Sequence, residues 1–289
     1  LREVVVEARA KVNLYLEVLG LRPDGYHEIE SLMHSIGLAD RISLTPVPEG
    51  IHLVCEGGDV PPGEENLAYR AALLVARRYP GRGGVRIALW KEIPTGAGLG
   101  GGSSDAAAVL RGLNQLWGLG LGWADLEGLG SELGSDVPFC IKGGAAVARG
   151  RGEFLEETRP WEGLPVVVAM PRGSHTSTAQ AYRFLDRVRG TGPPPRSAGA
   201  VASLVSALEA RDLARVAASL YNAFEEWALE ACPGVALLKL GIMEGGALGA
   251  VLTGSGPAVV GICALAERLR EAGAWAWAGE TGGAKRPGV

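Results

Sequence analysis

The stretch PTGAGLGGGSSDAAAVL, residues 94–110, combines residue types that can hold a phosphate. Five glycines fall between Pro94 and Ser104, and an alanine-rich segment with helical spacing follows them. A glycine-rich loop at the start of a helix presents unpaired N–H groups and the positive end of the helix dipole. One or two glycines would be enough for a tight turn between strand and helix. The pattern therefore favours a phosphate ligand.

Three kinds of phosphate loop can be compared with this stretch. A Walker A loop needs a lysine that is absent here. GAGLGG, residues 96–101, does match G-x-G-x-x-G, but Pro94 interrupts the approach from the strand and Asp125 begins a helix instead of ending a strand. The third kind is a different cradle, in which Ser103 and Ser104 add hydroxyl donors or a magnesium ligand. Either serine is also expected to be the N-cap of the helix.

Two charged residues could carry out phosphoryl transfer. In KVNLYLEVL, apolar and polar residues alternate, which predicts a strand with one buried face and with Lys11 and Asn13 together on the other, roughly 7 Å apart. Asp136 precedes Pro138, which is expected to keep Val137 out of helical geometry. A carboxylate can take the hydroxyl proton while an ammonium offsets the developing negative charge. A surface lysine and a self-capping aspartate are the alternatives.

The elements that would position these residues alternate between strands and helices, which predicts an α/β or α+β class. A strand is expected over residues 84–90 and a buried one over 164–170. Helices are expected after the glycine loop, over 124–133 and over about 200–230. Residues 247–263 are interpreted as two short strands around a second glycine-rich turn, and residues 189–199 as a loop.

The totals of the chain limit the class of protein. It has 289 residues, enough for two domains, and its 47% hydrophobic and 21% charged residues are ordinary for a soluble protein. A net charge of −4 argues against a nucleic-acid partner, and no apolar run is long enough to span a membrane. The N-terminus is interpreted as strands, not a signal peptide. The cysteines have no zinc spacing and are expected to be buried free thiols in a reducing, cytoplasmic setting: Cys55, Cys140, Cys232 and Cys263.

At this point the sequence resembles a known family, the GHMP kinases. PTGAGLGGGSSDAAA is similar to their P-x-x-x-G-L-G-S-S-A signature, KVNLYLEV to their N-terminal motif, and LTGSGPAVVG to their C-terminal glycine motif. The match covers most of residues 8–150 and is sparser over 160–289. The resemblance implies a two-lobed α/β (α+β) fold. Residues 1–160 would form an ATP-binding lobe like the second domain of ribosomal protein S5, and residues 161–289 a ferredoxin-like lobe.

The resemblance also implies a reaction and a set of site residues. ATP would donate its γ-phosphoryl group, with Mg²⁺, to the 2-hydroxyl of a small molecule, a cytidine-diphosphate ester of methylerythritol. Lys11 and Asp136 match the catalytic residues, and Asn13 would bind the substrate. The residues expected to hold the nucleotide are Pro94, Thr95, Gly96, Ala97, Gly98, Leu99, Gly100, Gly101, Gly102, Ser103 and Ser104, with Asn66 and Lys91. A solvated lysine is the competing interpretation of Lys91.

The turn RPDGYH, residues 22–27, would supply the contacts to the base. By resemblance, Tyr26 stacks on the cytosine ring, His27 bonds its edge, and Tyr182 is the second aromatic of a sandwich. Tyr182 could equally be buried in the core, and Tyr26 could simply pack on the turn.

Three alternatives remain beside this interpretation. Another GHMP kinase, acting on homoserine or mevalonate, is disfavoured by the turn RPDGYH. A nucleotide-binding protein without catalysis on the same fold is disfavoured by the presence of Lys11 and Asp136. A hydrolase built from Ser104, His27 and Asp136 lacks the sequence context of a nucleophile elbow. The sequence does not indicate the oligomeric state.

Overall fold

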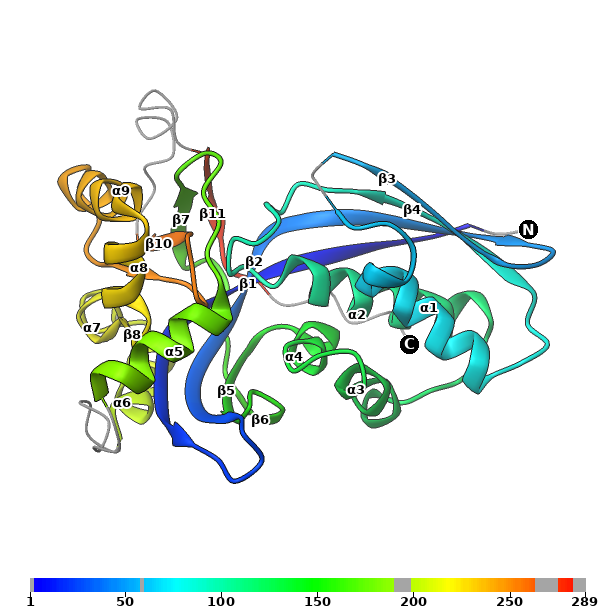
Figure 1. Ribbon diagram of the computed structural model, residues 1–289, viewed down its shortest axis with the longest axis horizontal. Coiled ribbons are helices and arrows are strands. Elements are labelled where there is room, and N and C mark those ends of the chain that lie inside the picture. Colours follow the sequence, from blue (N-terminus) through cyan, green and yellow to red (C-terminus); the bar gives the residue numbers. More distant parts are fainter. Residues whose placement is uncertain (1–2, 58–59, 190–198, 263–274, 283–289) are drawn as a thin grey trace. The chain divides into compact units, whose positions relative to one another are not determined.

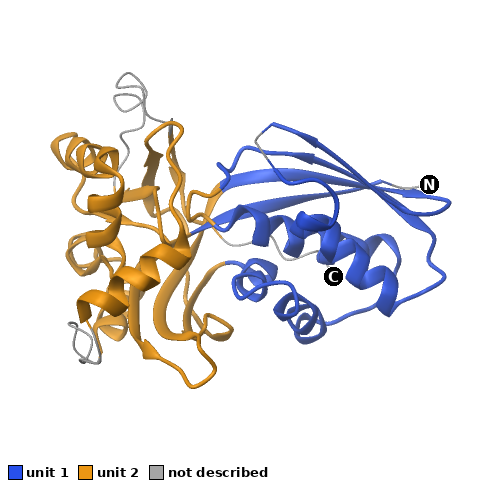
Figure 2. Ribbon diagram, in the orientation of Figure 1, with its two compact units in different colours: residues 1–11, 38–95, 100–143 blue, residues 12–37, 96–99, 144–289 orange. Residues whose placement is uncertain are grey.

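The structure, a computed structural model, describes residues 3–57, 60–189, 199–262 and 275–282. By their contacts, residues 1–11, 38–95 and 100–143 form one compact unit, called unit 1, and residues 12–37, 96–99 and 144–289 form unit 2 (Figure 2). The predicted lobes, by contrast, divide the chain once, after residue 160. That division stays a prediction.

Two long strands belong partly to each unit. They are β1 (Val4–Leu21) and β2 (His27–Val47), which are neighbours in one sheet. The expected strand around Lys11 is confirmed as part of β1. However, its polar positions are not at the surface, because Lys11, Asn13 and Glu17 are all buried. Polar side chains at such positions need internal partners, since an unpaired buried polar group is costly.

Unit 1 places helices on one face of its strands (Figure 1). Residues 41–47 of β2 pair antiparallel with β4, and β3 pairs parallel with β4. The expected strand over residues 84–90 is confirmed as β4. The elements are β3 (Ile51–Glu56), the 3₁₀ helix η1 (Gly63–Glu65), α1 (Leu67–Arg78), β4 (Gly84–Trp90), α2 (Gly101–Leu116), α3 (Trp123–Ser131) and α4 (Val137–Lys142). Helix α2 packs on α1 and α4 through its buried apolar residues.

Two local predictions in unit 1 are wrong. Helix α2 begins at Gly101, and its N-cap is Gly100 in the left-handed conformation, not Ser103 or Ser104. Helix α4 begins at Val137, although Pro138 follows. Proline is tolerated in the first helical turn, where its missing N–H would have no partner inside the helix. Proline thus opens this helix where it was expected to prevent one.

Unit 2 is a four-stranded antiparallel sheet with helices packed on it, together with β5, β6 and the parts of β1 and β2 that pair with β8 and β5. The sheet order is β11-β7-β10-β9. The elements are β5 (Ala145–Gly150), β6 (Phe154–Thr158), β7 (Pro165–Met170), α5 (Thr178–Arg189), α6 (Ala200–Glu209), α7 (Leu213–Ser219), β8 (Tyr221–Asn222), α8 (Glu225–Ala231), α9 (Pro233–Glu244), β9 (Ala250–Leu252), β10 (Val259–Ile262) and β11 (Trp275–Glu280). Its core joins β1, β7, β9 and β10 to α5, α8 and α9. The mixture of helices and sheets confirms the predicted class.

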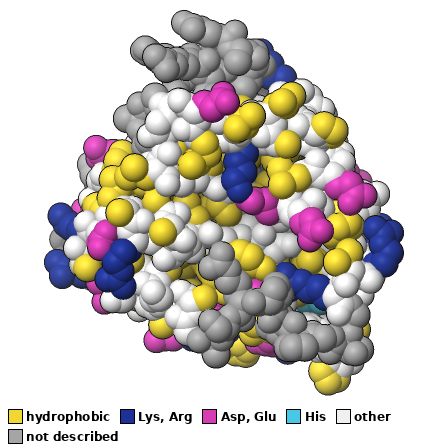
Figure 3. Space-filling view, turned by 90° about the vertical axis from the view of Figure 1, so that its left-hand side faces the viewer, with side chains coloured by type: hydrophobic (Ala, Val, Ile, Leu, Met, Phe, Trp, Pro, Cys, Tyr) yellow, Lys and Arg dark blue, Asp and Glu magenta, His cyan; other side chains and the backbone are white. Residues whose placement is uncertain are grey.

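The surface is mixed in character. Figure 3 shows one face, on which hydrophobic side chains gather with charged ones around and among them. Helix α9 contributes Leu237 and Leu240 to the exposed hydrophobic residues. Within the described ranges, no helix is long and apolar enough to cross a membrane.

The cysteine prediction holds only in part. Cys140 is a buried free thiol, whereas Cys55 and Cys232 are free but partly exposed, and Cys263 lies outside the described residues. Burial raises the pKa of the Cys140 thiol to about 12. This cysteine therefore behaves as a small apolar core residue.

Candidate active site

Lys11 and Asp136 form an ion pair in unit 1. The Nζ atom of Lys11 lies 3.4 Å from Oδ2 of Asp136; the lysine side chain is 6% exposed and the aspartate side chain 36%. Asp136 directly precedes α4, but its side chain makes no capping bond to that helix. The alternative role of Asp136, capping its own backbone, is therefore absent. The pair presents a carboxylate that solvent reaches beside an ammonium that solvent hardly reaches.

Gly100 lies against this pair. It has a φ of +70°, and a Cβ at this position would lie 3.0 Å from Cγ and 3.2 Å from Cε of Lys11. A side chain would therefore be strained by the backbone conformation and would push on the lysine. Glycine at position 100 allows the N-cap of α2 to approach the methylene groups of the Lys11 side chain.

The first turn of α2 can hold an anion. The first N–H groups of a helix have no partner inside the helix, and the helix dipole makes this end positive. Gly102 lies in this turn and is exposed, and a Cβ there would meet only Leu67 Cδ1, at an ordinary 3.5 Å. Nothing in the described chain therefore requires glycine at position 102. The described chain leaves the space above it open.

The two serines of the turn have different environments. The Ser104 hydroxyl is buried and donates to the carbonyl oxygen of Arg9 at 2.6 Å, which ties α2 to β1 two residues before Lys11. Ser103 is partly exposed. Of the two hydroxyls, that of Ser103 is the one placed to meet a ligand.

The tip of the glycine loop, residues 96–99, packs on the second glycine-rich turn within unit 2. Gly98 has a φ of +81°, and a Cβ there would collide with the carbonyl oxygen of Thr253. A Cβ at Gly254 would lie 2.9 Å from the carbonyl oxygen of Gly98. The N–H of Ala258 donates to the carbonyl oxygen of Ala97. Gly98 is therefore explained by backbone packing, without any ligand.

Asn13 joins β1 to the same turn. Its Nδ2 donates to Ser31 Oγ at 2.8 Å, and its Oδ1 accepts from the N–H of Gly254 at 2.9 Å. The residue is 2% exposed. Its side chain thus holds β1, β2 and the second glycine-rich turn together, and its contact with a substrate stays a prediction.

Lys91 and Asn66, both expected near the nucleotide, are also tied to the protein. The Lys91 ammonium lies between Asp40 and Asp105, and these three side chains are at most 4% exposed. Burial raises the pKa of Asp105 to about 7, which Lys91 opposes and Asp40 reinforces. Asn66 is the N-cap of α1 and accepts from the N–H of Ala68 at 2.9 Å. Their contacts with a nucleotide remain predictions.

The remaining loop residues differ in exposure. Ala97 and Leu99 are buried, whereas Thr95 and Gly96 are exposed and Pro94 is half-buried. Gly101, the first residue of α2, is half-buried over Lys91 and Ile93. The segment thus alternates between apolar residues that anchor it and small or polar residues that face outward.

The residues expected to bind a base lie in unit 2. The His27 ring stacks on the Tyr182 ring, with centroids 4.3 Å apart and an angle of 19° between the planes. His27 Nε2 lies 2.7 Å from Asp186 Oδ1. Tyr26 is 56% exposed, and the guanidinium of Arg151 lies 4.7 Å from the centre of its ring. The structure brings His27 and Tyr182 together, whereas Tyr26 faces solvent and Arg151.

Sequence reasoning missed several partners of these residues. Asp40 and Asp105 flank Lys91, Thr253 and Gly254 hold Asn13, and Asp186 holds His27. A lone aspartate within a mostly apolar strand segment, as at Asp40 in GLADRISL, is a signal that could have been used, because a buried carboxylate needs a partner.

No group of three or more His, Cys, Asp or Glu residues that could hold a metal ion occurs among the described residues. Mg²⁺ is usually held by one or two protein ligands together with substrate phosphates and water. The partly exposed Ser103 hydroxyl is a hard oxygen donor in the first turn of α2, where phosphates would supply further oxygen atoms. This donor set fits such a cation.

Comparisons with known proteins agree with this arrangement. The GHMP kinases N terminal domain matches residues 66–144, and the GHMP kinases C terminal domain matches residues 204–276. A 4-diphosphocytidyl-2-C-methyl-D-erythritol kinase from Synechococcus sp. (strain JA-3-3Ab) is 50% identical over 269 residues, which cover 92% of this chain and 86% of the relative. The whole glycine loop, residues 94–104, therefore falls inside a family match.

Solved structures show the same likeness. A crystal structure of 4-(cytidine 5'-diphospho)-2C-methyl-D-erythritol kinase has a TM-score of 0.81 and 39% identity, covering 96% of this chain and 99% of the other. A homoserine kinase from Cytophaga hutchinsonii has a TM-score of 0.71 and 20% identity, covering 97% and 94%, and shows the shared fold alone. The chain therefore belongs to the GHMP kinase family of small-molecule kinases.

Proposed function

We propose that this chain transfers the γ-phosphoryl group of ATP to the 2-hydroxyl of 4-diphosphocytidyl-2-C-methyl-D-erythritol. The observation that carries the proposal is the Lys11–Asp136 pair beside the N-cap of α2. The relatives at 39–50% identity bear the name of this reaction's enzyme. The product belongs to the non-mevalonate route to isoprenoid precursors.

The catalytic step needs a proton acceptor and a positive charge. Asp136 is reached by solvent, so its carboxylate can accept the proton of an incoming hydroxyl. Lys11, 3.4 Å away, supplies positive charge where the attacking oxygen and the transferred group gain negative charge. Either Asp136 takes the proton outright or it orients the hydroxyl while Lys11 lowers the pKa of that hydroxyl.

The nucleotide is expected at the first turn of α2. The N–H groups of this turn would bind the phosphates, and Gly102 leaves room for their approach. Mg²⁺ would be held by Ser103 and the phosphates, and when bound it would neutralise charge on the transferred group. The tie between Ser104 and Arg9 keeps the turn in place next to Lys11.

Base recognition is proposed for the ring residues of unit 2. Tyr26 is 56% exposed, and a pyrimidine could stack on its ring in place of the Arg151 guanidinium, which lies 4.7 Å from the ring centre. His27 is held by Asp186 through Nε2, which leaves Nδ1 for the edge of a base. Tyr182 already stacks on His27 and backs it. Homoserine and mevalonate have no base to use these residues.

The test is a phosphorylation assay with purified protein, ATP and Mg²⁺. The acceptors are the cytidine diphosphate ester, methylerythritol phosphate without its cytidylyl group, homoserine and mevalonate. We expect the first to react and the others to be very poor substrates, because binding energy from the base helps to position the hydroxyl. Equal reaction of the uncytidylylated compound would overturn the assignment of the substrate. Phosphorylation of homoserine or mevalonate alone would favour the alternative kinases.

A further inference from the structure

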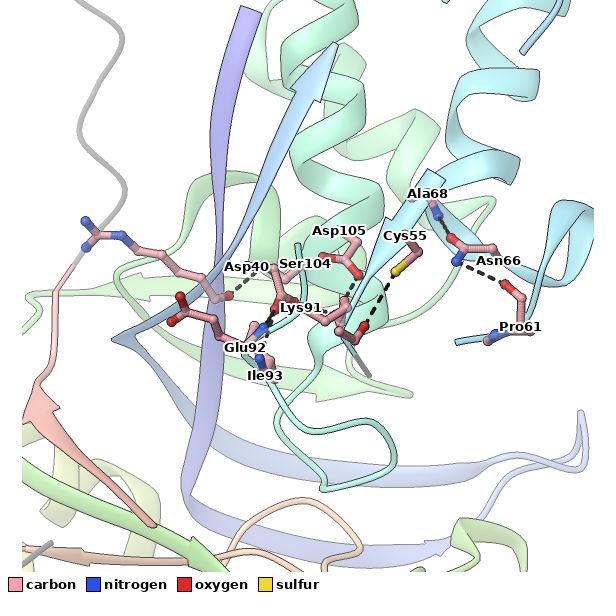
Figure 4. A network of polar contacts seen from close by, with 12 residues as sticks. Asp40, Cys55, Pro61, Asn66, Ala68, Lys91, Glu92, Ile93, Ser104 and Asp105 are labelled. Atoms are coloured by element: carbon pink, nitrogen blue, oxygen red, sulfur yellow. Dashed lines mark hydrogen bonds and ion pairs between the residues drawn. The ribbon is translucent and has the colours of Figure 1, made fainter. Parts of the chain in front are cut away.

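A buried cluster of charges lies at the entry to the glycine loop, in unit 1 (Figure 4). Asp40 comes from β2, Lys91 follows the end of β4, and Asp105 lies in α2. The Lys91 ammonium contacts Asp40 Oδ2, and it lies 2.7 Å from Asp105 Oδ2. The three residues therefore connect a strand, the entry to the loop and the helix that follows it.

Asp40 also holds the backbone at the entry to the loop. Its Oδ1 accepts from the N–H of Glu92 at 2.6 Å and from the N–H of Ile93 at 2.8 Å. Hydrogen bonds to an ionised acceptor are shorter and stronger than neutral ones. The carboxylate of Asp40 thus binds three consecutive residues, 91–93, immediately before Pro94.

The cluster extends to the first residue of α2. A Cβ at Gly101 would lie 3.0 Å from Ile93 Cγ2 and 3.3 Å from Lys91 Nζ. Gly101 therefore rests on two of the residues that Asp40 holds. The position of the α2 N-terminus therefore depends on the packing of Gly101 against Ile93 and Lys91.

Stability alone does not account for the cluster. One ammonium serves two carboxylates, and Asp105 Oδ1 is buried without a hydrogen-bond partner. Desolvating several charges is costly, and apolar residues of similar volume often stabilise a protein as well or better. Apolar residues would not fix the position of the loop as precisely, because they cannot accept hydrogen bonds from the backbone N–H groups of Glu92 and Ile93.

We propose that Asp40 is a positioning residue for nucleotide binding. It fixes residues 91–93 and, through Lys91 and Ile93, the place of Gly101, so that the first-turn N–H groups of α2 are preset for the phosphates of ATP. Asp40 acts through the loop and does not touch the nucleotide. The inference rests on the proposed role of the loop in holding ATP.

The test compares two substitutions of Asp40. Asp40→Ala removes both the charge and the acceptor, whereas Asp40→Asn keeps an oxygen for the N–H groups of Glu92 and Ile93 and places a donor toward Lys91. We expect the Kd for ATP, measured by calorimetry, to rise roughly ten-fold or more in Asp40→Ala and about three- to ten-fold in Asp40→Asn. The KM for ATP should follow, while the KM for the alcohol stays within about two-fold.

Leu44→Ala is the matched control. Leu44 lies four residues along the same strand, is fully buried, and packs near Gly112 of α2. Its truncation should lower the thermal stability without changing the Kd for ATP, because it removes packing and no contact to the loop. A rise in the Kd for ATP in Leu44→Ala as large as that in Asp40→Ala would overturn the inference, since general destabilisation would then explain both.

Other outcomes are also decisive. If Asp40→Ala does not fold, Asp40→Asn decides alone, and a Kd for ATP within two-fold of wild type overturns the inference. Calorimetry keeps the two proposals apart. A wild-type protein that binds ATP but phosphorylates no alcohol would refute the proposed function and still allow the Asp40 comparison. A protein that phosphorylates the cytidine ester while Asp40→Ala binds ATP normally would refute the positioning role only.

Discussion

The residues assigned to phosphoryl transfer in unit 1 and those assigned to base recognition in unit 2 differ in how far solvent reaches them. In unit 1, Lys11 and the supporting residues Lys91 and Asp40 are buried and engaged by opposite charges, and only Asp136, whose side chain is 36% exposed, is reached by solvent among these four. In unit 2, Tyr26 is mainly exposed and Asp186 is half exposed. A charge that stabilises a transition state works best when it is held in place and shielded from water. A ring that stacks on a base needs an open face.

This difference suggests that the two regions should respond differently to substitution. Changes in unit 1 should alter rate or nucleotide binding, because its groups are part of a fixed arrangement. Changes to the rings of unit 2 should alter substrate affinity and leave ATP binding as it is. The following variants test that contrast.

The largest effect is expected from Asp136→Asn. The variant keeps the shape of the side chain but removes its charge and its ability to accept a proton, so kcat should fall by about two orders of magnitude or more. ATP affinity should change little. The matched control is Asp125→Asn, which alters another aspartate of unit 1 that accepts from the N–H of Gly122. Near-normal turnover of Asp136→Asn would remove this residue from the mechanism.

The next effect concerns His34, a buried titratable residue of unit 2 that has no ion-pair partner among the described residues. Its Nδ1 donates to the carbonyl oxygen of Ser35, and its Nε2 accepts from the N–H of Trp161. Burial lowers the pKa of His34 from 6.5 to about 4, although the bond to Ser35 opposes this. The unfolded chain therefore takes up a proton below about pH 6.5, while the folded protein does so only near pH 4.

The sign of the pH effect follows from this difference. The contribution of neutral His34 to stability is complete above about pH 6.5 and is lost as the pH falls toward 4, by on the order of 3 kcal/mol. Urea unfolding of the wild type and of His34→Gln at several pH values measures it. The free energy of unfolding should fall more steeply with decreasing pH in the wild type. Equal slopes for the two proteins would contradict the assignment.

A smaller effect is expected from Tyr26→Ala. If its exposed ring stacks on the base, the variant should lose roughly 1–3 kcal/mol of binding to the cytidine diphosphate ester and none to ATP. Calorimetry with each ligand measures both. Trp123→Ala, at another partly exposed aromatic residue, serves as the control. Normal binding of the ester by Tyr26→Ala would leave the kinase assignment intact and remove the base contact.

The smallest effect is expected from Gly102→Ala. The added methyl fits the described chain, so thermal stability should hold, while the Kd for ATP should rise roughly three-fold because the methyl occupies ligand space. Gly98→Ala, in contrast, should lose thermal stability, because the added methyl group would collide with the carbonyl oxygen of Thr253. Unchanged ATP binding in Gly102→Ala would mean that phosphates do not approach this residue.

Gly100→Val and Gly101→Val should also weaken ATP binding. In Gly100→Val the new side chain would push on Lys11, and in Gly101→Val it would push on Lys91 and Ile93.

Much of the local structure could be predicted from the sequence. Periodicity located β1 and the helix after the glycine loop, short apolar segments located β4 and β7, and the glycine-rich motifs pointed to a GHMP kinase. The start of α2 was wrong because Ser103 and Ser104 are favoured N-caps, whereas Gly100 serves there through its left-handed backbone. The start of α4 was wrong because Pro138 is compatible with either a break or a first turn.

The long-range partners could not be predicted. Lys11 and Asp136 were assigned together through family resemblance, because 125 positions separate them in the sequence. The partners of Asn13 and Lys91 come from other strands, turns and helices, and periodicity carries no information about them. The sequence shows that the loop is rich in glycine, but it does not show what each glycine is for. Only the contacts distinguish the role of Gly98, which packs on backbone, from that of Gly102, which leaves open space.

The sharing of β1 and β2 between the units has a consequence for synthesis on the ribosome. All three segments of unit 1 precede residue 144, so its residues are complete first. Unit 2 already includes residues 12–37, yet Ile36 bridges to Thr281 and β7 pairs with β11. At about 5–20 residues per second, these early segments wait on the order of ten seconds for their partners. The nascent chain therefore carries unpaired strand edges long after unit 1 has been translated.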